Sequence, residues 1–120
     1  MLKYGKIMRS VGDFDQIFAE LPQIPGVWIF YRKNESKLAS PNFIDFSNYS
    51  LNHIPLMEGE EKVTRLEFSN NDIPSIDNLV SLQNLINVNL SHNLLKEISN
   101  LENVPKLRML DLSYNFINKI

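Results

Sequence analysis

The chain contains no cysteine and only four glycines, and its 12 Lys and Arg residues are outnumbered by 14 Asp and Glu residues. The lack of cysteine excludes a disulfide scaffold, a thiolate zinc site and a cysteine nucleophile. Four glycines leave little material for a phosphate-binding loop, and a net charge of −2 gives no basic footprint for nucleic acid. We therefore expect no cofactor, no bound metal and no direct contact with nucleic acid.

Long hydrophobic runs are also missing. The longest run, residues 27–31, has five residues, whereas a helix needs about 20 apolar residues to span a bilayer. The positive residues near the N-terminus are not followed by the hydrophobic stretch of a signal peptide. With 120 residues, of which 43% are hydrophobic, the chain can build one core. We expect a single cytoplasmic domain without membrane contact.

An internal repeat of 22 residues organises the chain from residue 44 onward. Each unit begins with two apolar residues that are separated by one residue and followed by serine. The four units begin at Ile44, Leu66, Val88 and Leu110. The same register holds at Leu51, Ile73, Leu95 and Ile117, and again at Ile54, Ile76, Ile98 and Ile120. This periodicity is typical of stacked units that share one core.

The spacing within one unit predicts its local structure. Val88 and Leu90 are separated by one residue, so both side chains point to the same face of a short strand. Apolar residues then recur every three positions, which predicts a short helical return that is partly 3₁₀. These residues are Ile98, Leu101, Val104 and Leu107. A strand followed by a helical return predicts an α/β fold.

Asparagine recurs at one position of the repeat, three residues after the second apolar residue of the strand. The three copies are Asn71, Asn93 and Asn115, and the first unit has Tyr49 instead. An amide side chain carries donors and an acceptor, so it can satisfy backbone groups of a buried turn. We expect these residues to form a structural ladder inside the stack.

Two segments, Leu66-Glu-Phe-Ser-Asn-Asn71-Asp-Ile73 and Leu110-Asp-Leu-Ser-Tyr-Asn115-Phe-Ile117, carry a family resemblance. They resemble leucine-rich repeats, and the 22-residue period with isoleucine at the Ile76 type of position is similar to the SDS22-like class. The resemblance covers residues 43–120. It implies a right-handed β-α solenoid of four repeats, the last truncated. It also implies protein partners such as a phosphatase catalytic subunit, cytoskeletal or ciliary assemblies, or signalling scaffolds.

Residues 1–42 lie outside the repeat register and are expected to form an N-terminal cap. The spacing of Phe14, Ile17, Phe18 and Leu21 predicts a helix over residues 13–21, with Asp13 as its N-cap. Residues 27–31 are rich in β-formers and predict a strand, and residues 32–37 predict a polar loop. The alternative to a plain cap is a ligand groove around Trp28 and its aromatic neighbours.

Outward-pointing residues of the predicted strands are expected to line a concave face that binds protein partners. The central row is Asp45, Glu67, Asn89 and Asp111. The flanking candidates for partner binding are Arg65, His92, Met109 and Tyr114. The acidic row favours a partner with a basic surface, and the aromatic residues and methionine are the better candidates for affinity.

Catalytic and metal-binding interpretations of this face are weaker. Asp45 and Glu67 form a possible acid–base pair, but an open face lets solvent screen their interaction. Ser91, His92 and Asp111 lack a nucleophile turn and an oxyanion hole, so we expect no hydrolase triad. No calcium loop or pair of histidines is present. His53 and the acidic run of residues 58–61 are expected to be solvated surface.

The last unit stops shortly after its strand, which predicts an open edge at Phe116, Ile117 and Ile120. Three explanations compete: a fragment of a longer protein, cover by a partner, and self-association. We favour the fragment. The main functional hypothesis is a non-catalytic protein–protein interaction module, either a scaffold or a regulatory subunit. The alternative is an N-terminal regulatory or targeting domain of a larger enzyme or signalling protein.

Overall fold

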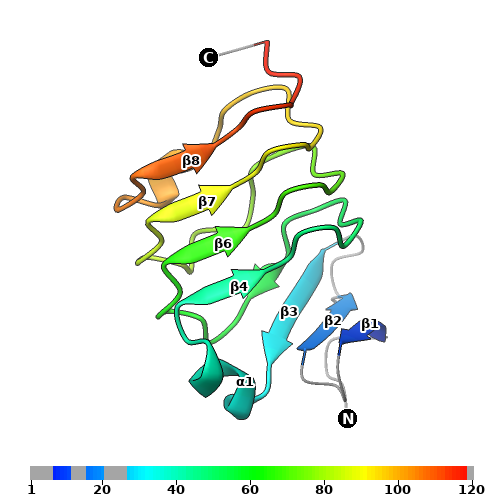
Figure 1. Ribbon diagram of the computed structural model, residues 1–120, viewed down its shortest axis with the longest axis vertical. Coiled ribbons are helices and arrows are strands. Elements are labelled where there is room, and N and C mark those ends of the chain that lie inside the picture. The colour runs from blue at the N-terminus through cyan, green and yellow to red at the C-terminus, as the bar shows by residue number, and fades with distance from the viewer. Residues whose placement is uncertain (1–6, 12–15, 21–26, 119–120) are drawn as a thin grey trace.

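The computed structural model describes residues 7–11, 16–20 and 27–118, and within them the backbone forms two four-stranded sheets (Figure 1). The N-terminal sheet has the order β1-β2-β3-β5, with β1 Ile7–Val11, β2 Gln16–Glu20, β3 Trp28–Arg32 and β5 Leu56–Met57. The second sheet has the order β4-β6-β7-β8, with β4 Phe43–Asp45, β6 Arg65–Glu67, β7 Asn87–Asn89 and β8 Met109–Asp111. Helix α1 (Asn34–Ala39) and the 3₁₀ turn η1 (Leu101–Asn103) complete these elements. The predicted α/β class is confirmed, with strands in the majority.

The second sheet is parallel throughout and keeps the 22-residue register of the sequence. Ile44 pairs with Leu66, Leu66 with Val88, and Val88 with Leu110. Beyond the strands, the backbone bonds repeat as well: Phe68 donates to the carbonyl of Asn89, and Leu90 to that of Asp111, both at 2.8 Å. The units therefore stack along the longest dimension of the molecule, 43 Å (Figure 1).

The apolar repeat positions lie in one continuous core. Leu66, Phe68, Leu85 and Leu90 are completely buried, because each is covered by the units on both sides. The same core includes Phe18 and Phe30 from the N-terminal sheet. Burying a side chain of this size stabilises the fold by about 1.5–3 kcal/mol. Neither sheet buries this surface alone, so the two sheets depend on each other.

An aromatic column joins the two sheets. The ring centroids of Phe18 and Phe30 are 5.0 Å apart, those of Phe30 and Phe46 are 4.7 Å apart, and those of Phe46 and Phe68 are 4.9 Å apart. The first two pairs are tilted or edge-on, and the last is stacked. These are the separations at which aromatic pairs attract beyond simple area burial.

The helix predicted over residues 13–21 is wrong, because residues 16–20 form strand β2. Asp13, Phe14 and Leu21 lie outside the described residues. Strand β2 pairs with β3 along its whole length, which gives its backbone the hydrogen-bond partners that a helix would have made internally. An isolated helix of nine residues is marginal in water, so pairing with a neighbouring strand overrides the short apolar periodicity.

The segment that follows also differs from expectation. The predicted strand at residues 27–31 is confirmed, displaced by one residue as β3. The polar loop predicted over residues 32–37 is wrong, because Asn34–Ala39 form helix α1, which has no buried residue. Its Glu, Lys, Leu and Ala are good helix formers, so local propensity explains a helix without an apolar face. The 3₁₀ turn η1 lies in the helical return predicted for residues 98–107.

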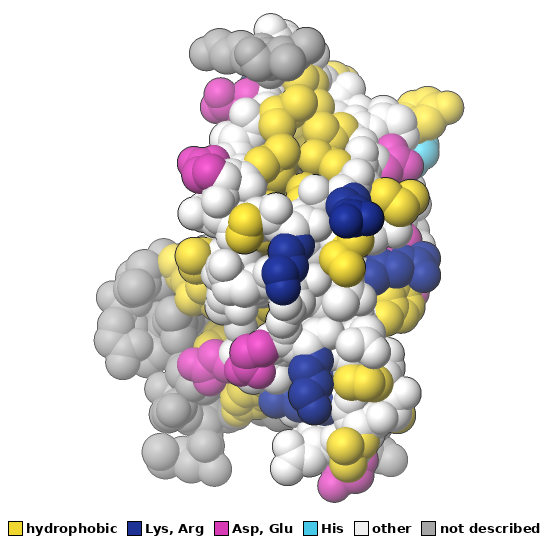
Figure 2. Space-filling model, turned by 90° about the vertical axis from the view of Figure 1, so that its left-hand side faces the viewer, with side chains coloured by type: hydrophobic (Ala, Val, Ile, Leu, Met, Phe, Trp, Pro, Cys, Tyr) yellow, Lys and Arg dark blue, Asp and Glu magenta, His cyan; other side chains and the backbone are white. Residues whose placement is uncertain are grey.

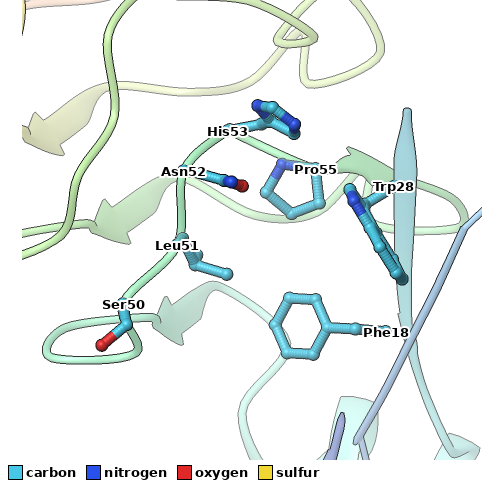
Figure 3. Close-up of a pocket in the computed structure, with 7 residues that line it drawn as sticks. All are labelled: Phe18, Trp28, Ser50, Leu51, Asn52, His53 and Pro55. Carbon is cyan, nitrogen blue, oxygen red and sulfur yellow. The ribbon is translucent and has the colours of Figure 1, made fainter. Parts of the chain in front are cut away.

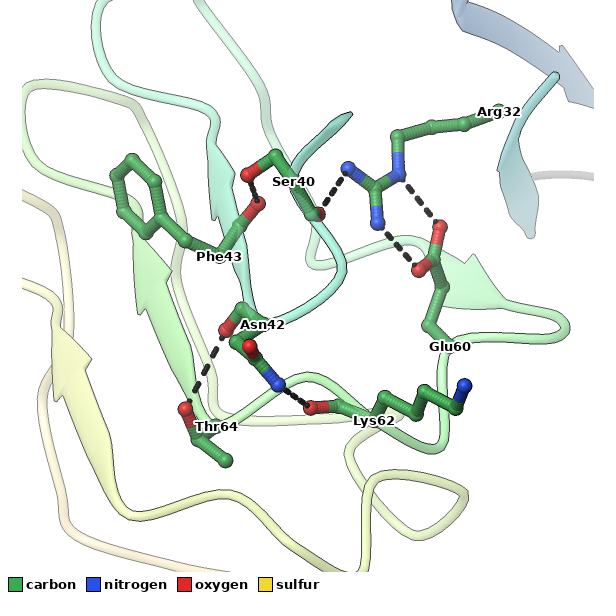
Figure 4. Close-up of polar contacts among 7 residues, drawn as sticks. All are labelled: Arg32, Ser40, Asn42, Phe43, Glu60, Lys62 and Thr64. Carbon is green, nitrogen blue, oxygen red and sulfur yellow. Dashed lines mark hydrogen bonds and ion pairs between the residues drawn. The ribbon is translucent and has the colours of Figure 1, made fainter. Parts of the chain in front are cut away.

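A buried ion pair joins β3 to the first unit (Figure 4). The Nε and Nη2 atoms of Arg32 donate to the two carboxylate oxygens of Glu60 at 2.9 and 2.7 Å, and Nη1 donates to the carbonyl of Ser40 at 2.9 Å. The two side chains are only 3% and 2% exposed. The expectation that residues 58–61 are solvated is therefore wrong for Glu60, whose partner is too distant in the sequence to be recognised.

Replacing Glu60 with glutamine should leave the buried guanidinium of Arg32 without its counter-charge. We expect Glu60→Gln to lower the free energy of unfolding by about 3–5 kcal/mol, as measured by denaturant titration. The neighbouring exposed residue provides the control: Glu61→Gln should change stability by less than about 0.5 kcal/mol. Equal effects of the two substitutions would contradict a structural role for the ion pair.

One asparagine side chain pairs the backbone at each of the turns that follow β6, β7 and β8, whereas the turn after β4 has Tyr49 in this position. Nδ2 of Asn93 donates to the carbonyls of Phe68, Leu90 and Ser91 at 2.9–3.1 Å. Its Oδ1 accepts from the N–H of Ile73 at 3.0 Å. Asn71 and Asn115 make the same bonds one unit earlier and one unit later. Each amide thus connects its own unit to the preceding one.

A second set of asparagine contacts joins consecutive units farther from the strands, at residues 78 and 100. Nδ2 of Asn78 donates to the carbonyl of Ile54 at 2.8 Å, and Nδ2 of Asn100 donates to that of Ile76 at 2.7 Å. Both residues have a positive φ, 61° and 60°. Asparagine tolerates this conformation better than most residues do. These two contacts were not predicted, although the 22-residue separation of Asn78 and Asn100 is visible in the sequence.

Removing the Asn93 amide should leave several buried backbone groups unpaired. We expect Asn93→Ala to lower the free energy of unfolding by about 1–3 kcal/mol, measured by thermal or denaturant unfolding. Asn115→Ala is the matched comparison. It deletes the same type of contacts at a half-buried position, where water can replace them, so its effect should be smaller. An unchanged unfolding curve for Asn93→Ala would rule out this role.

Candidate functional site

Side chains of the central row lie side by side across four neighbouring strands. Asp45 pairs in register with Glu67, Glu67 with Asn89, and Asn89 with Asp111. Alternation along each strand turns these residues away from the buried Ile44, Leu66 and Val88 positions. These side chains form one polar row on the side of the β4-β6-β7-β8 sheet that points away from the core; Figure 1 shows the four strands. We call this side of the sheet the outer face.

Three members of the central row are held by the same local contact. Oδ1 of Asp45 accepts from the backbone N–H and the hydroxyl of Ser47, at 2.9 and 2.6 Å. Oδ1 of Asp111 accepts from the same two groups of Ser113, at 3.0 and 2.7 Å. In the third unit, Oδ1 of Asn89 accepts from the N–H of Ser91 at 2.9 Å. These contacts fix the side chains and leave Oδ2 of both aspartates without a hydrogen bond to any described residue.

Glu67 is held differently. Its Oε2 lies 3.2 Å from Nη2 of Arg65 on the same strand, and the guanidinium carbon of Arg65 lies 4.6 Å from the centre of the Phe43 ring. The side chain of Arg65 is 52% exposed, so the ion pair contributes little to stability. Its main effect is to place one positive charge beside the acidic row, over an aromatic ring.

The edge of the outer face near β8 carries exposed aromatic and thioether groups. The rings of His92 and Tyr114 are stacked, with centroids 4.3 Å apart and an interplanar angle of 9°. Tyr114 is 74% exposed and Met109 is 60% exposed. Both His92 and Tyr114 have φ of 57°, in the left-handed region where Asn48 and Asn70 occupy the same position of earlier units. Bulky residues are uncommon there and cost about 1–2 kcal/mol.

A hollow of about 340 Å³ lies on the outer face beside Met109. It is lined by Glu67, Asn87, Asn89, Met109, Leu110, Asp111 and Leu112. Nδ2 of Asn87 on β7 lies 3.7 Å from the sulfur of Met109 on β8, so the thioether reaches the neighbouring strand. The hollow is open to solvent and combines two carboxylates, two amides and a thioether. Such a surface suits contact with another protein better than it suits enclosure of a small molecule.

Groups needed for nucleophilic catalysis are not assembled here. Ser91 is buried, His92 stacks on Tyr114, and Asp111 is bonded to Ser113, so no hydrogen bond links the three. Among the described residues, no group of three His, Asp or Glu side chains could hold a metal ion. Likewise, none of the helices described is long and apolar enough to cross a membrane.

A second pocket lies where the N-terminal sheet meets the first unit (Figure 3). It encloses about 260 Å³ and is lined by Phe18, Trp28, Ser50, Leu51, Asn52, His53 and Pro55. Trp28 is half-buried and faces Pro55 and Phe18, with His53 at the opposite rim. Trp28, the centre of the predicted ligand groove, lines this pocket, but its aromatic neighbours Phe30 and Tyr31 do not. His53, expected at the surface, is half-buried at the pocket. Whether a ligand binds there stays a prediction.

The serine contacts of the central row were not predicted from the sequence, although the sequence contains a pattern that indicates them. The pattern Asp/Asn-x-Ser occurs at residues 45–47, 89–91 and 111–113. Aspartate and asparagine often bond the backbone two residues onward, so this pattern predicts the contacts seen. The positive φ of His92 and Tyr114 has no comparable signal, because it is imposed by the turn that all units share.

Comparison of the chain with protein-family models and with curated proteins found no match. The interpretation of the outer face therefore depends on its own geometry and chemistry.

The serine contacts lower the pKa of Asp111. The largest cause is the hydroxyl of Ser113, followed by its backbone N–H, with a smaller contribution from the charge of His92. We expect Ser113→Ala to raise the pKa of Asp111 toward its ordinary value of 3.8, as measured by NMR titration of the carboxyl carbon. Ser75→Ala is the matched control, since it removes the hydroxyl bonded to the distant Asp77.

The sign of the pH effect on stability follows from this direction. A carboxyl whose pKa is lower in the folded chain stabilises the fold at pH values above its unfolded pKa, and this contribution is lost as the pH falls through the folded pKa. The Ser113→Ala chain should be less stable than the original at neutral pH, and the difference should shrink in strong acid. A difference independent of pH would show that the hydroxyl acts through something other than Asp111.

Proposed function

We propose that the chain is a leucine-rich repeat solenoid of the SDS22-like class and a non-catalytic protein–protein interaction module, acting as a cytoplasmic scaffold or regulatory subunit through the outer face. One observation carries this proposal. Side chains of the central row lie in register across four parallel strands, and hydrogen bonds within the chain hold three of them in place.

Preorganisation is the physical reason why such a face suits binding. Association costs free energy for each side chain that has to be ordered, about 0.5–1.5 kcal/mol for a side chain with many rotamers. Asp45, Asn89 and Asp111 are already fixed by the serine contacts, and Glu67 by Arg65. A partner that meets these groups therefore loses little affinity to ordering them.

Charge defines the class of partner. Asp45, Glu67 and Asp111 place three carboxylates in one row against the single guanidinium of Arg65. The free Oδ2 atoms of Asp45 and Asp111 can accept hydrogen bonds from lysine or arginine. A partner with a basic surface thus fits the row, and the charges mainly raise the association rate and the specificity. Met109, Tyr114 and His92 are the affinity anchors at the β8 edge.

Half-buried core positions in the fourth unit favour a second candidate function. Leu110, Leu112 and Ile117 are less covered than their equivalents in the preceding unit. In this alternative, the chain is the N-terminal regulatory or targeting domain of a larger enzyme or signalling protein.

The experiment compares the chain with the variant Asp45→Asn, Glu67→Gln, Asp111→Asn. Asn89 already makes the serine contact with an amide oxygen, so these substitutions remove charge and keep the turns intact. We expect slower and weaker capture of a basic protein partner from cell extract, most strongly at about 0.05 M salt and less at about 0.5 M, where charges are screened. Capture is quantified by mass spectrometry.

A matched control removes three charges elsewhere on the surface. The variant Glu61→Gln, Glu97→Gln, Glu102→Gln changes net charge equally at exposed positions away from the central row. It should retain the partners of the original chain. If both variants lose the same partners, the effect is one of overall charge. If neither loses any, the outer face is not the binding surface.

A further inference from the structure

Two hollows adjoin where the N-terminal sheet meets the repeat units. The first is the pocket of about 260 Å³ shown in Figure 3, and the second has a volume of about 380 Å³. Trp28 and His53 line both hollows, so the two meet at these side chains. None of the described residues that line them belongs to the outer face.

The first hollow combines an apolar surface with unused polar groups. Phe18, Leu51 and Pro55 make it mainly apolar. Figure 3 shows the indole of Trp28 beside them, with its nitrogen at the end of the ring nearer His53. Nε1 of Trp28 and the ring nitrogens of His53 make no hydrogen bond with any described residue. A half-buried indole with an unused N–H offers a ligand an aromatic surface and a donor next to it.

The second hollow is lined by polar groups that the repeat units hold in place. Asn78 and Asn100 each donate through Nδ2 to a backbone carbonyl of the preceding unit, at 2.8 and 2.7 Å. These bonds fix the two carboxamides and leave both Oδ1 atoms available to a ligand. The carboxylate of Asp77 accepts from the hydroxyl of Ser75 at 2.6 Å and from Nδ2 of Asn100 at 3.4 Å, so it is fixed as well.

Two further carboxamides line the hollows and are not used elsewhere in the described part of the chain. Asn52 lines the first hollow and Asn103 the second, and neither side chain bonds to a described residue. Each offers N–H donors together with a carbonyl acceptor. With the oxygens of Asn78 and Asn100, they form a mixed set of donors and acceptors around the indole.

The charges of the site disfavour an anionic ligand. None of the described residues that line the two hollows is lysine or arginine, and Asp77 is negative. The Lys and Arg side chains visible in Figure 2 lie on the side of the molecule at which β4, β6, β7 and β8 begin, whereas residues 50–55 of the site follow the end of β4. A nucleotide, a sulfated sugar or an acidic peptide would therefore meet no counter-charge here.

A neutral saccharide has the complementary chemistry. Each sugar hydroxyl both donates and accepts hydrogen bonds, which matches the carboxamides of the site. A pyranose ring with equatorial hydroxyls also has a flat face of C–H groups, which packs on an aromatic surface. A proline-rich peptide fits less well, because such peptides dock in grooves lined by aromatic side chains, whereas asparagine and aspartate line most of the described part of the second hollow.

We propose that the two hollows form a binding site for a neutral oligosaccharide built from pyranose rings of the gluco configuration. One ring packs on Trp28 in the first hollow. The next ring bonds through its hydroxyls to Asp77 and to the asparagine side chains of the second hollow. The site goes beyond the proposed function, since it uses a different surface and a different class of ligand.

The experiment uses the full chain labelled with ¹⁵N. Trp28 is its only tryptophan, so a single indole N–H signal reports on the site. The probes are cellotetraose, maltotetraose and tetra-N-acetylchitotetraose, each titrated to about 10 mM, which detects dissociation constants of about 1 mM. We expect at least one of them to shift the indole signal in a saturable way.

Side-chain variants test the position of the ligand. Asn103→Ala removes a carboxamide that bonds to no described residue, so it should leave the fold intact and weaken saccharide binding about tenfold, the loss expected for one or two hydrogen bonds. Asn34→Ala, at an exposed position of α1, is the matched control and should bind like the original chain. The outer-face variant Asp45→Asn, Glu67→Gln, Asp111→Asn should also keep this binding, which separates the proposal from the proposed function.

Three results would overturn the proposal. The first is the absence of a saturable shift with all three saccharides. The second is saccharide binding that Asn52→Ala and Asn103→Ala both leave unchanged, because the ligand would then lie elsewhere. The third is a decaproline peptide that shifts the same indole signal and binds more tightly than every saccharide, because the occupant would then be a proline-rich peptide.

Discussion

At the turns after β6, β7 and β8, one asparagine side chain pairs polar groups of the backbone of its own unit and of the preceding one. Asn93 is only 3% exposed and bonds to four backbone groups on two consecutive units. A buried, unpaired backbone group costs about 1–3 kcal/mol, so without this amide the turns could not be buried. The strand register and the regular spacing of the outer face both depend on that contact.

Features that depend on the repeat could be predicted from the sequence, whereas features that depend on contacts between residues unrelated by the repeat could not. The period of 22 residues set the register of β4, β6, β7 and β8, because each unit repeats the same local pattern and meets only its neighbours. Residues 16–20 were predicted as helix and form β2, since their conformation is decided by pairing with β3. Arg32 and Glu60 lie 28 residues apart without any repeat to relate them, so their ion pair had no local signal.

In the candidate site, too, one feature could be predicted from the repeat and another could not. Alignment of Asp45, Glu67, Asn89 and Asp111 follows from the repeat and was predictable. Stacking of His92 on Tyr114 was not, because it requires two bulky residues to adopt the left-handed conformation of their turns. The cost of that conformation is offset where the turn is held by Asn93 and Asn115. Strained exposed aromatics at one edge are the kind of feature that points from structure to function.

The outer face is largely ordered before any partner is present. Its polar side chains are held by bonds within the chain, and a partner gains from charge, from aromatic contact and from the Oδ2 atoms of Asp45 and Asp111, which bond to no described residue. The asparagine amides connect consecutive units and so hold the strands that carry this face at a regular spacing.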